Sequence, residues 1–222
     1  MNKLKRNLIV TAVIAAVLAA VLGTALLVSP DDRGGGGTDV QPAADARPVR
    51  ADSHRLTDPK KSELTVVEFL DFECEGCGAM YPVVEKLREE YGDRVTFVAR
   101  YFPMPGHRNG ELAARTAEAA ARQGKFEEMY TKLFTTQEEW GESQDWKQDV
   151  FRGYAKQLGL DMGKFDAALA DPDTAGRVQA DQRDGLGLGA RGTPTFVVDG
   201  AVIPTPASYA DFKALIEERL AD

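Results

Sequence analysis

The chain has 222 residues, of which 43% are hydrophobic, so it is long enough for one substantial domain with appendages. Its net charge is −8, but residues 1–28 carry three basic side chains and no acid. Residues 29–222 therefore hold 24 basic and 35 acidic residues, a net charge of −11. An acidic body of this kind repels phosphate backbones, and no basic patch with interleaved aromatic residues appears. We therefore expect no nucleic-acid partner.

The first 28 residues predict a short basic stub in the cytoplasm followed by a transmembrane helix. Residues 8–28 are a run of 21 residues without a charge. At about 1.5 Å of rise per residue, a helix of this length spans roughly 30 Å of hydrocarbon. Basic residues precede the run and acidic residues follow it, which predicts a single-pass protein of the cell membrane with an extracytoplasmic body. A signal peptide is the alternative, and both interpretations export the rest of the chain.

Residues 29–53 have the composition of a disordered linker. They contain four consecutive glycines at 34–37, three prolines and almost no large apolar side chain. Such a segment cannot bury enough surface to offset the entropy of ordering. The predicted folded body then runs from residue 54 to residue 221.

The body begins with a strand–helix–strand unit. Residues 64–72 are apolar on both faces except at Glu68 and Asp71, which is typical of a central strand that is covered on both sides. Helical spacing of apolar residues follows over 79–91, and residues 94–102 predict a second strand. This order predicts a parallel strand pair with a right-handed crossover.

A helical insertion is predicted between the two halves of the sheet. From about 109 to 185, apolar residues repeat at helical spacing in segments separated by Gly, Asp or Pro. Residues 195–198 and 201–203 then predict a hairpin, and residues 207–220 predict an amphipathic helix. The expected fold class is α/β, with a central mixed sheet flanked by helices and an inserted all-helical subdomain.

Cys74 and Cys77 are the only two cysteines, and they stand where the first strand meets a helix. The helix start favours the thiolate of Cys74, and Cys77 is near enough to close a disulfide on it. A static disulfide here would close almost no loop and would add little stability. A zinc site would require His54 and His107 to join both thiols. The pair therefore predicts redox chemistry rather than a metal site, with Cys74 as the attacking thiol and Cys77 as the resolving one.

Glu68 is the strongest supporting residue, because it lies in an apolar strand six positions before Cys74. An ionisable group is costly to bury there. A buried acid beneath a dithiol can take up and return a proton as Cys77 attacks a mixed disulfide. The alternative is an acid at an exposed edge of the sheet.

Acidic residues also flank the attacking thiol directly. Asp71, Glu73 and Glu75 place negative charge around Cys74, which disfavours its thiolate. A strong disulfide oxidant needs a stabilised thiolate in its reduced form, so this cluster predicts moderated oxidising power.

These features resemble the DsbA-like thiol–disulfide oxidoreductases of the thioredoxin fold, in the membrane-anchored form common in Gram-positive and especially actinobacterial envelopes. The resemblance covers residues 54–221 and keeps the family's order of segments. The matching segments are Val67-Glu68-Phe69-Leu70-Asp71-Phe72-Glu73-Cys74-Glu75-Gly76-Cys77, Tyr101-Phe102-Pro103 with the alanine-rich helix after it, Leu133-Phe134 with Trp140, and Gly192-Thr193-Pro194-Thr195-Phe196-Val197-Val198-Asp199-Gly200.

The resemblance implies a role for each residue of the site. Cys74 would be the nucleophile, Cys77 the resolving cysteine and Glu68 the buried proton acceptor. Pro194 would be a cis-proline that faces the disulfide, and Thr193 would offer its backbone to an extended substrate chain.

The sequence departs from the family between the two cysteines. The best-known oxidising members carry Pro-His there, and that histidine helps to stabilise the thiolate. Glu75 and Gly76 stand in its place here and supply no such cation.

The implied function is exchange of the Cys74–Cys77 disulfide with thiols of reduced exported proteins, with no cofactor and with recycling by a membrane or small-molecule oxidant. A reductase of the cell envelope, serving cytochrome or metal-site maturation, is the first alternative. A non-catalytic domain that binds a partner, or that holds copper on its thiols, is the second, because a fold does not dictate its function.

Overall fold

Our computed structural model describes residues 43–221, which contain the folded body. The transmembrane helix predicted within residues 1–28 and the first part of the predicted linker lie outside these residues. Within residues 43–221, no helix is both long enough and apolar enough to cross a membrane.

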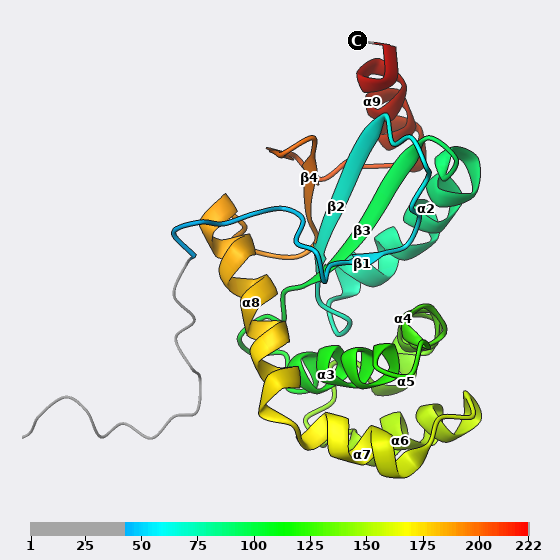
Figure 1. Cartoon of the computed structure of the whole chain (residues 1–222), viewed down its shortest axis with the longest axis vertical. Coiled ribbons are helices and arrows are strands. Elements are labelled where there is room, and N and C mark those ends of the chain that lie inside the picture. Colours follow the sequence, from blue (N-terminus) through cyan, green and yellow to red (C-terminus); the bar gives the residue numbers. More distant parts are fainter. Residues whose placement is uncertain (1–42, 222) are drawn as a thin grey trace, which may run out of the picture. The chain divides into compact units, whose positions relative to one another are not determined.

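A five-stranded mixed sheet lies at the centre of the described residues. In spatial order its strands are β1 (His54–Arg55), β3 (Val95–Tyr101), β2 (Leu64–Leu70), β4 (Thr195–Val198) and β5 (Ala201–Ile203). β2 and β3 pair in parallel, as the strand–helix–strand order predicts, and the other neighbours pair antiparallel. β2 is therefore the central strand (Figure 1).

Helices cover both faces of the sheet. They are α2 (Glu75–Tyr91) and α9 (Tyr209–Ala221) on one face and α8 (Pro172–Leu188) on the other (Figure 1). Alternate residues of β2 enter two separate hydrophobic clusters, Val66 and Leu70 on the α2 side, and Val67 and Phe69 on the α8 side. Glu68 has the same alternation as Val66 and Leu70, so it faces the helix that carries the cysteines.

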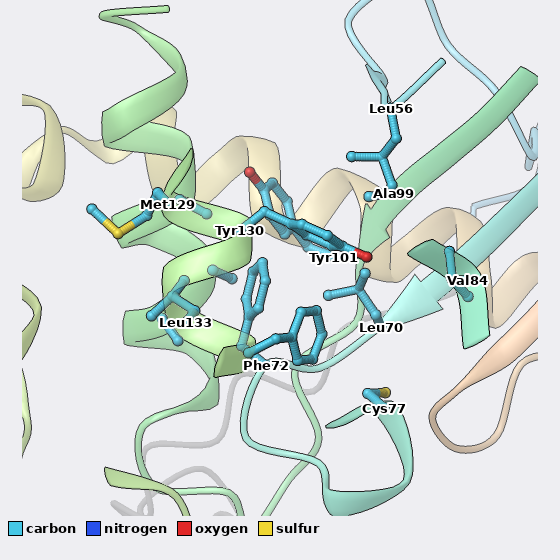
Figure 2. Close-up of a cluster of buried hydrophobic side chains, with 14 of the residues drawn as sticks. Leu56, Leu70, Phe72, Cys77, Val84, Ala99, Tyr101, Met129, Tyr130 and Leu133 are labelled. Carbon is cyan, nitrogen blue, oxygen red and sulfur yellow. The ribbon is translucent and has the colours of Figure 1, made fainter. Parts of the chain in front are cut away.

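The helical insertion lies between β3 and β4, where the sequence predicted one. Its helices are α3 (Gly110–Ala121), α4 (Phe126–Thr135), α5 (Gln137–Trp140), α6 (Gln148–Gln157), α7 (Met162–Ala170) and α8. Its core is continuous with that of the sheet, because the ring of Phe72, just after β2, lies 6.0 Å from Tyr130 and 5.0 Å from Phe134. Figure 2 shows Cys77 beside Phe72 at this junction. The cysteines therefore lie at the boundary between sheet and insertion.

The predicted disordered linker extends too far toward the body. Residues 43–53 lie against α8, where the amide of Arg47 and the guanidinium of Arg50 both donate to the buried carboxylate of Asp184. Val49 packs against the cluster on the α8 side of the sheet. The prediction of disorder is wrong for these residues because charge-assisted contacts hold them, whereas the composition argument counted only large apolar side chains.

A buried ion cluster fixes α8 to β3. The guanidinium of Arg100 is fully buried and donates to Asp181 at 2.5 Å and to Asp184 at 2.6 Å.

Arg100→Ala would leave both carboxylates without their central cation, so we expect a loss of about 3–5 kcal/mol in the free energy of unfolding, measured by urea denaturation. The control is Arg94→Ala, whose pair with Glu63 is exposed, and it should cost less than about 1 kcal/mol. Equal losses in both variants would contradict the prediction.

Candidate active site

The two cysteines lie at the start of α2, just after the carboxyl end of β2. The helix begins at Glu75, four residues earlier than the apolar spacing predicted, and Cys74 precedes it in an extended conformation. Both thiols are free, and Cys77 is fully buried whereas Cys74 is partly exposed. An accessible thiol next to a buried one is the arrangement that an attacking and a resolving cysteine require.

The local environment stabilises the thiolate of Cys74. A hydrogen bond from the Cys77 thiol is the largest cause that lowers the pKa of Cys74 to about 5. The backbone N–H groups of Cys77 and Gly76 act in the same direction, while burial opposes them. The N–H groups of a helix start have no partner within the helix, so they are available to a negative sulfur atom.

Glu68 lies beneath the dithiol rather than at an exposed edge of the sheet. It is 5% exposed, and within the described residues its Oε1 has no hydrogen-bond partner. Burial, with the charges of Cys74 and Glu85 adding to it, raises the pKa of Glu68 to about 8. Burial also raises the pKa of Cys77 well above its ordinary value, and the charge of Glu68 contributes. At neutral pH the carboxyl of Glu68 is therefore mostly protonated beside a thiol that resists ionisation.

The segment before β4 faces the cysteines from the other side of the site. The Thr193–Pro194 peptide bond is cis, and the carbonyl of Thr193 accepts a hydrogen bond from the Sγ of Cys74 at 3.3 Å. A Cβ atom on Gly76 would approach the Cδ of Pro194 to 3.3 Å, so a glycine here allows the close approach of the two segments. Glu75, the other residue between the cysteines, is exposed.

Two of the three acids beside Cys74 do not surround it with free negative charge. Asp71 and Glu73 are buried, and the carboxylate of each accepts at least one backbone N–H group. Asp71 lies 2.6 Å from the Nδ1 of His107, and Glu73 accepts from the amide of Asn109 at 2.6 Å. The predicted opposition of this cluster to the thiolate is therefore outweighed, because the pKa of Cys74 is lowered by its hydrogen bonds.

Two further residues belong to the site, and the sequence analysis did not place them there. The amide of Gln137 in α5 donates to the carbonyls of Phe72 at 2.7 Å and Cys74 at 2.9 Å, which fixes the start of α2 to the insertion. No local pattern marks Gln137. His107 could have been found, because Asp71 and His107 follow the ends of two parallel strands and so reach the same edge of the sheet.

The two histidines of the chain are held by different acids. The Nε2 of His54 lies 2.7 Å from Glu118, and its ring stacks on Phe126 with 3.8 Å between centroids. His107 contacts Asp71 instead. Among residues 43–221, no three His, Cys, Asp or Glu side chains gather as they would to bind a metal ion. The four-ligand zinc site considered from the sequence is therefore not assembled.

Comparisons with known proteins agree with the fold that carries this dithiol. The family model described as Thioredoxin matches residues 57–218. The chain belongs to the thioredoxin family. A thioredoxin-like oxidoreductase from Silicibacter pomeroyi DSS-3 is 26% identical, with a TM-score of 0.66 over 78% of this chain and 95% of that chain. The fold also matches that of α-DsbA1 from Wolbachia pipientis, at 18% identity, with a TM-score of 0.69 over 78% of this chain and 93% of that chain. The chain thus shares its fold with a DsbA protein and its family with the thioredoxins.

Curated relatives of this thioredoxin-family chain include much longer proteins. The Na⁺/H⁺ antiporter NhaA of Herminiimonas arsenicoxydans is 37% identical over 153 residues, which are 69% of this chain and 23% of the antiporter. The chain thus spans about a quarter of the length of that relative. Because the family match covers residues 57–218, the greater part of the aligned segment must lie within the thioredoxin-family region of this chain.

Proposed function

We propose that this protein is a membrane-anchored, extracytoplasmic oxidase that passes its Cys74–Cys77 disulfide to thiols of reduced exported proteins. The proposal rests on the opposite pKa shifts of the two thiols. The pKa of Cys74 is lowered to about 5, whereas the pKa of Cys77 is raised well above its ordinary value. A stabilised thiolate in the reduced form makes the corresponding disulfide a stronger oxidant.

The exchange takes two steps. A substrate thiolate attacks the Sγ of Cys74, the Cys74–Cys77 bond breaks, and Cys77 leaves as a thiolate. A second substrate thiolate then attacks the substrate sulfur of this mixed disulfide and releases Cys74. The substrate loses two electrons and two protons and gains a disulfide, and the protein gains the two electrons. The low pKa of Cys74 makes it a good leaving group in the second step.

Glu68 supplies the proton that the first step needs. Cys77 leaves as a thiolate in a buried position, where an unpaired charge is costly. Glu68 faces the same helix, and its carboxyl has a pKa near 8, below that of Cys77. The proton therefore moves from Glu68 to Cys77 in this direction, and one of the protons that the substrate releases then reprotonates Glu68. When a membrane or small-molecule oxidant removes the two electrons and restores the disulfide, the proton of Cys77 leaves through Glu68 in the reverse direction.

The backbone at Thr193 is the proposed contact for the substrate chain. Its carbonyl already lies 3.3 Å from the Sγ of Cys74, at the start of β4. An extended substrate segment that pairs with this backbone would place its own sulfur against Cys74. The proposed substrates are therefore unfolded or extended chains that carry reduced cysteines.

A measurement of the reduction potential tests the direction of electron flow. For the proposed oxidase we expect a value closer to about −120 mV, typical of a strong disulfide oxidant, than to about −270 mV, typical of thioredoxin. The value comes from equilibration of the protein with glutathione buffers. A potential near −270 mV would favour the envelope reductase over the oxidase.

The location rests on the sequence of residues 1–28 and has its own test. In intact cells that produce the full chain, an externally added protease should degrade the body if it lies outside the membrane. Protection of the body in intact cells, with degradation after lysis, would contradict the proposed location. The transport activity named for the antiporter relatives is not extended to this chain, because the aligned segment is 23% of that protein.

A further inference from the structure

The dithiol motif lacks a cation between its cysteines, yet a histidine reaches the site from another part of the fold. His107 follows β3, and its Nδ1 lies 2.6 Å from the Oδ2 of Asp71. The side chain of Asp71 is fully buried, whereas that of His107 is 30% exposed. The ring is therefore held from within the protein while one side meets solvent.

Asp71 joins this histidine to the start of α2. Its backbone carbonyl accepts the amide of Cys74 at 3.1 Å, and its Oδ1 accepts the amide of Glu73 at 2.9 Å. One residue thus contacts both the imidazole of His107 and the backbone that carries the attacking sulfur. A shift or loss of the imidazole would leave the carboxylate of Asp71 uncompensated next to Cys74.

The charges around His107 are negative. Asp71, Glu73 and the Cys74 thiolate face it, and the hydrogen bond to Asp71 is the largest cause that raises the pKa of His107 to about 9. Its neighbour Arg108 points instead to the ring of Trp146. At neutral pH His107 is therefore an imidazolium within an acidic cluster, and it is joined to Cys74 through Asp71, which contacts both residues.

We propose that His107, oriented by Asp71, is a positioning residue that stabilises the thiolate of Cys74 from outside the dithiol motif. It supplies the positive charge that Glu75 and Gly76 do not. The inference deepens the proposed function, since a more stable thiolate means a more oxidising disulfide. The proposed effect of His107 on the Cys74 thiolate does not depend on whether the protein acts as an oxidase or as a reductase.

Titration of the Cys74 thiolate, followed by its ultraviolet absorbance in the reduced protein, tests the inference. For His107→Gln we expect the pKa of Cys74 to rise by about one unit. This is the lower end of the range of pKa shifts that a neighbouring charge produces, because solvent partly screens the imidazole. The equilibrium constant with glutathione should shift about tenfold toward the oxidised protein, or about 30 mV toward more reducing values. His107→Lys should recover part of both shifts.

The matched control is His54→Gln, which removes the chain's other histidine at its pair with Glu118 and should leave the pKa of Cys74 unchanged. An unchanged pKa in His107→Gln, or equal values in His107→Gln and His107→Lys, would overturn the proposal. A reciprocal measurement needs no change at His107: in Cys74→Ser the pKa of His107, followed by NMR, should fall. No fall would equally overturn it. None of these readouts uses a substrate, so failure of the proposed oxidase function would leave them intact.

Discussion

Cys77→Ala is expected to turn the protein into a covalent trap for its partners. The Cys74 thiolate of this variant can still attack a disulfide of an exported protein and form a mixed disulfide. The Cys77 sulfur that would displace the bound chain is absent, so the complex should persist. Non-reducing gels of cells that produce the full-length variant should show bands that disappear with reductant, and mass spectrometry should identify exported proteins in them.

Cys74→Ser is the matched control, because it removes the accessible sulfur and retains the buried one. It should trap nothing, and its thiol-exchange rate should equal that of a reaction without protein. If Cys77→Ala traps no protein, the exchange mechanism is contradicted. That result would instead favour a thioredoxin-like domain that binds a partner or copper without catalysis, and the copper content of protein purified under reducing conditions would separate these two.

Glu68→Gln is expected to remove a large contribution to the pH dependence of stability. The pKa of Glu68 is raised from its ordinary 4.5 to about 8 in the folded protein. The folded state therefore binds the proton more tightly than the unfolded state does. The cost of burying the carboxylate is absent below pH 4.5, grows as pH rises, and is complete above about pH 8. For this group the loss amounts to roughly 4–5 kcal/mol in the free energy of unfolding.

Urea denaturation of the reduced protein at several pH values measures this effect. Between pH 5 and pH 8, roughly the window set by the two pKa values of Glu68, the free energy of unfolding of the wild type should decrease relative to that of Glu68→Gln. The Cys74 thiolate adds stability over the same window in both proteins, because its pKa is lowered to about 5, so the quantity to compare is the difference between the two curves. Glu111→Gln changes an exposed carboxyl and should follow the wild type. Thiol exchange by Glu68→Gln should also slow by about 10²-fold at neutral pH, as expected for loss of a general acid–base. If the free energy of unfolding depends on pH in the same way in wild type and Glu68→Gln, the prediction that burial raises the pKa of Glu68 is wrong.

The order of elements and the redox pair are readable in the sequence because their signals are local. Two-sided apolar character predicts the central strand β2, and strand–helix–strand order predicts its parallel pairing with β3. The limits of β4 and β5 follow from β-branched residues on each side of Asp199-Gly200. The start of α2 directly after Cys74 agrees with the predicted helix start at the cysteines. The apolar repeat begins only at residue 79, because the first turn of the helix has small and polar residues.

The sequence by itself determined the fold class, the position of the helical insertion, and the candidacy of Cys74, Cys77 and Glu68. Only the tertiary structure decided how these groups are charged. The partners of Asp71 and Glu73 come from residues about 36 positions later in the chain, so counting acids near Cys74 could not give the net effect on its thiolate. A pKa depends on burial and on charges nearby in space, and parallel strand pairing brings together segments that no local pattern connects.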